Sequence, residues 1–205
     1  TDKLIDRYQE KKVYETIGDM NICDPVIYIN PEKGYKITEF LENSRVCDPM
    51  NCLDVKRSME CLKKFHDKKL VVGHEFDLFE QIEKYEVLWG NSESIYEDYE
   101  KTKSEVYSLK AFIDGHITEK VLTHIDAVPD NFLFVKDQQG KEEIRLIDWE
   151  YAGMQDPYVD IAMFGIYSLY DREHMEQLID AYFAEGCSRE TRIKIYCYIA
   201  AGGLL

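Results

Sequence analysis

Hydrophobic and polar positions along this chain follow two different periods, and each period predicts its own kind of element. Apolar residues that recur every three or four positions predict helices, which we place at 5–17, 53–66, 93–113, 159–183 and 189–201. Short apolar runs bounded by turn residues predict strands, which we place at 26–29, 35–40, 132–135 and 144–147. These strands pair off as two hairpins, so the pattern as a whole predicts an α+β fold.

The order of these elements divides the chain into three parts. Residues 1–37 carry one helix and one hairpin, which predicts a small, partial β lobe. Residues 38–52 are polar and rich in turn residues, so we expect a hinge or linker there. Residues 53–205 hold the other helices and the second hairpin, which predicts a mainly helical lobe with the catalytic site. The chain opens in a charged stretch and closes on an apolar one. Because natural termini are usually polar, we expect both ends to be incomplete.

Composition narrows the classes of partner. Apolar residues make up 45% of the 205 residues, which is enough for the core of one domain or two small lobes. The net charge of −15 is expected to repel nucleic acid and anionic membrane surfaces, and it is compatible with a cationic small molecule. The sequence shows neither a signal peptide nor a long apolar run, so we expect a cytoplasmic protein without a membrane partner.

Cysteine and histidine give no sign of a metal centre. The six cysteines include no Cys-x-x-Cys pair, and we expect reduced thiols. Four histidines lack metal-ligand spacing and are expected to be surface residues or satisfied core residues: His66, His74, His116 and His174.

Three polar residues, Asp126, Asn131 and Asp148, carry the strongest chemical signal in the sequence. Asn131 directly precedes one strand of the second predicted hairpin, and Asp148 closes the other strand. Because a two-stranded ribbon brings its two ends together, we expect these side chains to face one cavity. The set suits phosphoryl transfer: Asp126 would orient a hydroxyl nucleophile, while Asn131 and Asp148 would bind Mg²⁺. His124 is expected to brace the loop rather than to react.

The same residues also have a plainer interpretation. Asp and Asn are ordinary turn residues, and residues 129–131 can form a turn without any function. The context favours the phosphotransfer interpretation, because a strand follows Asn131 directly and an acid stands at the far end of the hairpin.

Several segments of the sequence resemble a known superfamily. Residues 124–131, HIDAVPDN, resemble the catalytic loop of the choline/ethanolamine kinase and aminoglycoside phosphotransferase superfamily. Residues 146–162, with the pattern LIDWEYAG…DP…DIA, are similar to the bacterial choline kinases of the LicA type. The likeness extends to residues 35–41 and 72–77, so it covers nearly the whole chain.

The resemblance implies a protein-kinase-like fold that uses ATP and Mg²⁺. It makes Asp126 the catalytic base, Asn131 and Asp148 the magnesium ligands, and Asp160 a buried carboxylate that supports the catalytic loop.

The resemblance also implies nucleotide contacts in the N-terminal part. Glu10 matches the partner of the ATP-binding lysine. The interlobe hinge, whose backbone would bind adenine, consists of Thr38, Glu39, Phe40 and Leu41. In the family, the phosphate-covering loop and the ATP-binding lysine precede the position of Glu10, and further pocket helices follow that of Leu205. We therefore expect little activity from the chain as written.

A choline substrate would need aromatic faces and negative charge, because its nitrogen has no hydrogen-bond donor. The candidates near the catalytic hairpin are Glu150, Tyr151, Tyr167 and Tyr170. Tyr167 and Tyr170 are three residues apart on a predicted helix, so they are expected to share one face. Ordinary packing is the alternative role for these aromatic residues. The resemblance itself places an acidic residue near the position of Tyr167 in other choline kinases, and this chain has none there.

The sequence therefore predicts an ATP-dependent phosphotransferase that acts on the hydroxyl of choline. Ethanolamine, an aminoglycoside or another amino alcohol are alternative acceptors. A different alternative is a non-catalytic fragment or pseudokinase that only binds its ligands. The intact Asp126, Asn131 and Asp148 favour the enzyme.

Overall fold

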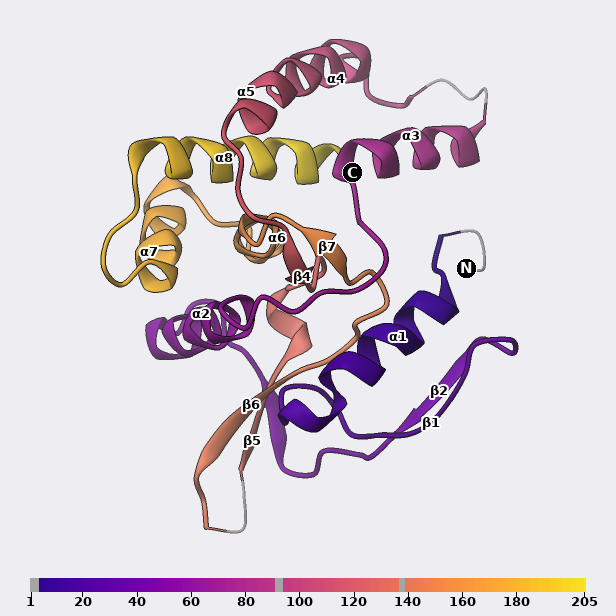
Figure 1. The fold of residues 1–205 in the computed structure, drawn as a ribbon. Helices are drawn as coiled ribbons and strands as arrows, with labels where there is room; N and C mark the ends of the chain where they lie inside the picture. The colour runs from indigo at the N-terminus through magenta and orange to yellow at the C-terminus, as the bar shows by residue number, and fades with distance from the viewer. Residues whose placement is uncertain (1–3, 91–93, 137–138) are drawn as a thin grey trace.

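The N-terminal part of the chain is a helix that packs on a hairpin (Figure 1). The computed structural model describes residues 4–90, 94–136 and 139–205. Helix α1 (Arg7–Ile17) begins where the Asp6 carboxylate accepts hydrogen bonds from the amides of the first turn. A short 3₁₀ turn, η1 (Gly18–Met20), leads to strands β1 (Val26–Asn30) and β2 (Tyr35–Thr38), which pair antiparallel. The predicted helix and hairpin are confirmed in this part.

A second sheet carries the other predicted hairpin. Strands β5 (Phe132–Lys136) and β6 (Glu142–Leu146) pair antiparallel in the register that sets Phe132 opposite Leu146. Strand β3 (Ser44–Val46) adds to β5, so the segment predicted as a hinge or linker contains a strand. The hairpin is confirmed, and its register brings Asn131, just before β5, beside Ile147, just after β6: the Ile147 amide donates to the Asn131 carbonyl at 2.9 Å.

The rest of the chain is mainly helical. A short sheet pairs β4 (Val121–Thr123) with β7 (Gly153–Gln155), and a 3₁₀ turn, η2 (Pro129–Asn131), precedes β5. The helices are α2 (Cys52–His66), α3 (Leu78–Trp89), α4 (Tyr99–Ser108), α5 (Lys110–Gly115), α6 (Tyr158–Tyr167), α7 (Arg172–Tyr182) and α8 (Arg189–Leu204). In Figure 1, α8 runs towards α3, and α4 and α5 lie over this pair. None of the helices in the described ranges has both the length and the apolar character needed to cross a bilayer.

Two of the predicted helices are wrong in extent. The helix placed at 93–113 is two helices, α4 and α5, and Ile95, within the predicted range, precedes both and is 88% exposed. Its first residue, 93, lies outside the described residues. The helix placed at 159–183 ends at Tyr167, because Leu169 has a φ of +53° that a helix does not allow. A new helix, α7, then begins behind the cap residue Asp171.

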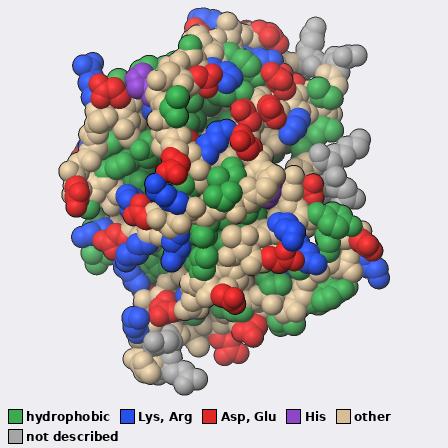
Figure 2. All heavy atoms as spheres, viewed as in Figure 1, with side chains coloured by type: hydrophobic (Ala, Val, Ile, Leu, Met, Phe, Trp, Pro, Cys, Tyr) green, Lys and Arg blue, Asp and Glu red, His purple; other side chains and the backbone are tan. Residues whose placement is uncertain are grey.

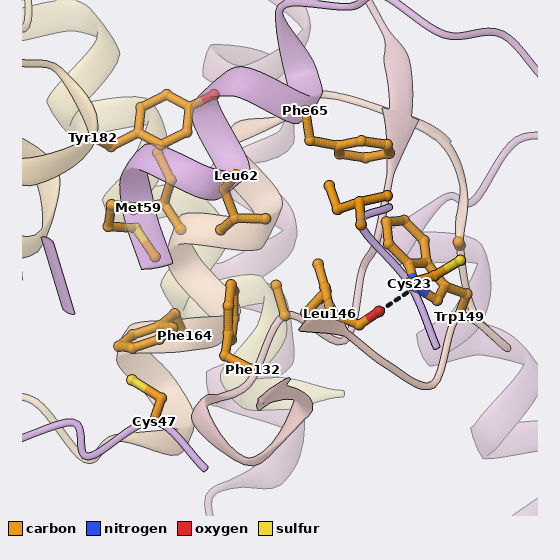
Figure 3. Close-up of a cluster of buried hydrophobic side chains, with 14 of the residues drawn as sticks. Cys23, Cys47, Met59, Leu62, Phe65, Phe132, Leu146, Trp149, Phe164 and Tyr182 are labelled. Atoms are coloured by element: carbon orange, nitrogen blue, oxygen red, sulfur yellow. Dashed lines mark hydrogen bonds between the residues drawn. The ribbon is translucent and has the colours of Figure 1, made fainter. Parts of the chain in front are cut away.

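The core lies directly beneath the ends of the β5–β6 hairpin. Trp149, Phe65 and Phe132 are buried there, and the Trp149 indole N–H donates to the Leu146 carbonyl at 2.6 Å (Figure 3). The rings of Trp149 and Phe65 meet edge to face at 5.0 Å. This packing fixes the chain on both sides of Asp148. On the face shown in Figure 2, acidic and basic side chains are interspersed over the surface.

Candidate active site

The loop that follows β4 carries Asp126 in a strained conformation. Ile125 has a φ of +72°, which is an outlier for a β-branched residue. The buried carboxylate of Asp160, on α6, holds this conformation from below: Oδ1 accepts the Ile125 amide at 2.7 Å and Oδ2 accepts the His124 amide at 3.0 Å. Hydrogen bonds from two successive amides to one carboxylate are charge-assisted and strong. Asp160 therefore fixes the backbone one residue before Asp126.

The structure brings Asp126, Asn131 and Asp148 to one place. The Asn131 amide Nδ2 donates to the Asp126 carbonyl at 2.8 Å and to its carboxylate Oδ2 at 3.1 Å. Asp148 has a φ of +64° and is exposed, whereas Asp126 and Asn131 are half-buried. Burial raises the pKa of Asp126, and the charge of Asp148 raises it further, so the two carboxylates act on each other.

His124 links the loop after β4 to the end of β6. Its ring Nε2 donates to the Ile147 carbonyl at 2.9 Å, and its ring meets Trp149 edge to face at 4.5 Å. Burial lowers the pKa of His124 although three carboxylates lie nearby, which favours the neutral ring. Its Nδ1 is the one buried side-chain polar atom without a hydrogen-bond partner in the described part of the chain. His124 therefore holds the loop after β4 against the end of β6, which suits the bracing role expected from the sequence.

An ionic chain links α1 to the segment after Asp148. The guanidinium of Arg7 donates to Glu10 at 2.8 Å and to Glu150 at 2.9 Å. Glu10 is only 3% exposed and also pairs with Lys36 of β2 at 3.1 Å. Burial, followed by the charge of Asp148, raises the pKa of Glu150. Glu10 thus has two cationic partners within this chain, and neither was anticipated from the sequence.

The predicted hinge follows β2 directly. Thr38 ends the strand, and the Glu39 amide donates to the Pro25 carbonyl at 2.9 Å, which extends the β1–β2 hairpin by one hydrogen bond. The Phe40 side chain is 88% exposed, and Leu41 is half-buried. The adenine contact proposed for these residues stays a prediction.

Two tyrosines, Tyr151 and Tyr167, lie within electrostatic reach of Asp126, and Tyr85 interacts with both of them. The phenols of Tyr85 and Tyr151 interact, and the charge of Asp126 contributes to the raised pKa of both Tyr151 and Tyr167, although burial is the larger cause for each. Tyr85 belongs to α3, a helix that the sequence analysis did not place. Its signals were the cap residue Asp77, which accepts two amides of the first helical turn, and the inward Leu78 and Ile82.

Tyr170 lies elsewhere. Its hydroxyl donates to the Pro49 carbonyl, and its ring stacks on His174 with centroids 5.3 Å apart. The predicted face shared by Tyr167 and Tyr170 is wrong, because α6 ends at Tyr167 and Tyr170 lies in the turn that follows. The structure therefore places Tyr167, and not Tyr170, in the neighbourhood of Asp126.

A large cleft lies beside this site. Its volume is about 640 Å³, and it is bordered by the start of α1, the β1–β2 turn, residues 74–76 and residues 150–152. Asp126, Asn131 and Asp148 are not among its lining residues. Glu150 and Tyr151, which follow Asp148 by two and three residues, line this cleft.

The donor atoms of the triplet suit a magnesium ion that also binds phosphate. Both hydrogen bonds of Asn131 to Asp126 use its Nδ2 donors, which leaves Oδ1 as a ligand atom. Asp148 adds an exposed carboxylate. No cluster of three His, Cys, Asp or Glu side chains with metal-binding geometry occurs in the described ranges. Two protein oxygens, completed by nucleotide phosphates and water, match the usual habit of Mg²⁺.

The sequence and the fold of this chain are similar to those of known proteins. The family described as choline/ethanolamine kinase matches residues 1–190. Protein LicA of Haemophilus influenzae is 26% identical over 171 residues, which are 80% of this chain and 60% of that protein. The crystal structure of choline kinase LicA from Streptococcus pneumoniae is 30% identical and superimposes with a TM-score of 0.82, covering 97% of this chain and 69% of that one.

A crystal structure of LicA in complex with AMP is similar to the same degree, with a TM-score of 0.80, 30% identity, and coverage of 97% of this chain and 67% of that chain. The resemblance seen in the sequence and the protein-kinase-like α+β fold that it implies are thereby confirmed. The chain spans about 60% of the length of the curated relative that it matches.

Proposed function

The chain belongs to the choline/ethanolamine kinase family, and from that premise we propose that it transfers the γ-phosphoryl group of ATP to the hydroxyl of choline. One observation carries the proposal. The Asn131 amide binds Asp126 through both of its hydrogen bonds, so a base and a hard oxygen ligand are fixed side by side next to Asp148. The similar LicA structure in complex with AMP supports ATP as the donor.

In the proposed step, the choline oxygen attacks the γ-phosphorus of ATP, and the bond from that phosphorus to the β–γ bridging oxygen breaks. ADP leaves, and the hydroxyl proton passes to the Asp126 carboxylate. The pKa of Asp126 is raised, first by burial, which makes it a better proton acceptor than an exposed aspartate. Asn131 orients that carboxylate through the 3.1 Å hydrogen bond to Oδ2.

Asn131 Oδ1 and Asp148 would hold Mg²⁺, which when bound supplies positive charge to the nucleotide phosphates. Glu10, proposed to pair with an ATP-binding lysine, binds Lys36 and Arg7 in this chain. The hinge residues Thr38, Glu39, Phe40 and Leu41, where β2 ends, are proposed to contact adenine through their backbone.

Tyr85, Tyr151 and Tyr167 support a cationic acceptor. The charge of Asp126 acts on Tyr151 and Tyr167, Tyr85 interacts with both tyrosines, and Glu150 adds a half-buried carboxylate next to Tyr151. Aromatic faces and negative charge attract a quaternary ammonium group without needing a donor on nitrogen. Ethanolamine offers three N–H donors, and Glu150 and the tyrosine hydroxyls would accept them, so it is the second candidate.

The test is ADP release by the full-length protein that carries these 205 residues, with ATP, Mg²⁺ and one acceptor at a time. We expect kcat/KM for choline to exceed that for ethanolamine, and kanamycin to give no turnover. The neutral isostere 3,3-dimethylbutan-1-ol should be about tenfold worse than choline, because it lacks the charge that the aromatic faces bind. Turnover of kanamycin alone would refute the choline assignment, and nucleotide binding without turnover of any acceptor would support a pseudokinase.

Asp126→Ala should lower kcat by about 10²- to 10⁴-fold, the usual contribution of a general base. Asp130→Ala is the matched control, since Asp130 is an exposed aspartate of the same loop, and its kcat should stay within twofold of wild type. Equal rates for wild type and Asp126→Ala would remove Asp126 from the mechanism.

A further inference from the structure

A buried chain of hydrogen bonds runs beneath the catalytic loop from three different helices. His66, at the end of α2, makes two of them: its Nε2 lies 2.9 Å from Asp160 Oδ2, and its Nδ1 lies 2.8 Å from the Tyr182 hydroxyl. Tyr182 is the last residue of α7, and Asp160 lies in α6. All three side chains are buried, with exposed fractions of 4%, 4% and 0% for His66, Tyr182 and Asp160. Figure 3 shows the Tyr182 hydroxyl turned towards α2.

The direction of each hydrogen bond follows from the groups present. Asp160 already accepts the amides of His124 and Ile125, so it acts as a carboxylate. Its bond to His66 therefore needs a proton on Nε2. A neutral ring then has a lone pair on Nδ1, which must accept from the Tyr182 hydroxyl. Burial raises the pKa of Tyr182, so the phenol keeps the proton that it donates.

We propose that Tyr182 is a positioning residue for the catalytic loop: by donating to His66 Nδ1, it holds the ring in the tautomer that donates from Nε2 to Asp160. The proposal rests on the proposed function only in that this loop carries the catalytic base, Asp126. Without the hydroxyl, the proton of the ring is free to move to Nδ1, and a bare Nε2 would face the carboxylate of Asp160. That carboxylate is what keeps Ile125 at a φ of +72°.

The chain offers a matched pair of variants for a test that needs no activity. Tyr182→Phe removes the hydroxyl and keeps the ring. Tyr198→Phe is the control, because Tyr198 is also 4% exposed and its hydroxyl also donates to a neighbouring group, Asp156 Oδ2 at 3.0 Å. The readout is the exchange rate of the Ile125 amide divided by that of the Leu122 amide, whose β4 hydrogen bond to Leu70 does not involve Asp160.

We expect this ratio to rise about fivefold in Tyr182→Phe, the effect of weakening one buried hydrogen bond, and to change by less than twofold in Tyr198→Phe. In the wild-type chain, ¹⁵N shifts of His66 should show a protonated Nε2 and an unprotonated Nδ1. An unchanged ratio in Tyr182→Phe, or a His66 ring protonated on both nitrogens, would overturn the proposal.

A second variant tests whether Tyr182 acts through His66. His66→Gln places an amide donor near the position of Nε2 and has no ring tautomer to hold. On this background Tyr182→Phe should leave the exchange ratio within twofold, so the double-mutant cycle should be strongly non-additive. The same fivefold rise on both backgrounds would show that Tyr182 acts by packing alone, and the proposal would be wrong.

Kinetic measurements distinguish a failure of this proposal from a failure of the proposed function. If the chain is active, Tyr182→Phe should lower kcat about fivefold and leave KM for ATP and for choline within twofold, because the substrate contacts are untouched. A wild-type, full-length protein that turns over no acceptor would refute the proposed function, while the exchange ratio would still decide the role of Tyr182.

Discussion

At the scale of single residues, the surroundings of Asp126 disfavour the ionised form of its carboxyl group. Burial is the main cause of its raised pKa, and the carboxylates of Asp148 and Asp160 add to it. Because the folded-state pKa lies above the unfolded one, Asp126 favours the folded state most at pH values below its unfolded pKa. This contribution is lost as the pH rises through the folded pKa. Ionised Asp126 therefore destabilises the fold in the pH range where a base is needed.

Asp126→Asn should then raise the free energy of unfolding at pH 7 while it abolishes transfer. The amide variant does not titrate at this position, so its free energy of unfolding should exceed that of wild type least at acidic pH. The difference in free energy of unfolding should grow as the pH rises through the folded pKa of Asp126 and stay constant above it. Urea titrations of both proteins at several pH values measure this difference. An advantage for wild type at pH 7 would contradict the assigned direction of the pKa shift.

The residues of the candidate site differ in how far the sequence alone could reveal them. The spacing of Asp126, Asn131 and Asp148 around a hairpin was enough to bring them together, because hairpin pairing is a local property. The bond between His66 and Tyr182 joins residues 116 positions apart. No local pattern encodes such a contact, so His66 could be expected only to be a satisfied histidine.

At the scale of elements, α7 side chains pack directly against the backbone of α6 at Gly165. A methyl group there would overlap the Met175 sulfur and lie 2.9 Å from its terminal carbon, and Met175 is buried on α7. Because the buried Met175 side chain must shift, Gly165→Ala should lower the free energy of unfolding by up to about 2 kcal/mol, the overpacking cost less the gain in helix propensity. Gly203→Ala on α8 meets open space and should raise it by up to about 1 kcal/mol. Thermal melts of both variants compare the two, and stabilisation by Gly165→Ala would contradict this packing.

At the scale of elements, the structure also explains why the sequence pattern did not predict some helices and strands correctly. A continuous apolar pattern hid the break between α6 and α7, because neither Gly nor Pro marks it and the turn relies on Leu169 at positive φ. Strand β7 has three residues and is held by pairing with β4 and by backbone hydrogen bonds of Met154 to His74 and Phe76, all of which lie far away in the sequence. Helix α3 was readable from its cap residue Asp77 but was not placed. Helix existence was thus easier to predict than helix ends, which tertiary contacts decide.

At the scale of the whole molecule, the net charge of −15 acts on any charged acceptor. A cation is attracted over distances of about a Debye length, which is about 10 Å at 0.1 M salt. Raising KCl from 0.02 to 0.2 M at saturating ATP should lower kcat/KM for choline about threefold. It should leave kcat/KM for the neutral isostere 3,3-dimethylbutan-1-ol unchanged. Equal salt dependence for both acceptors would show that long-range charge plays no part in choline capture.

The strained loop is held from the buried side, by side chains of α2, α6 and α7. The aromatic residues on its open side come from α3, from Tyr151 after β6 and from the last residue of α6. The two groups share no side chain. Substitutions on the open side can therefore exchange one alcohol for another during evolution while the geometry of the base is inherited unchanged, which is how a single scaffold comes to serve many acceptors.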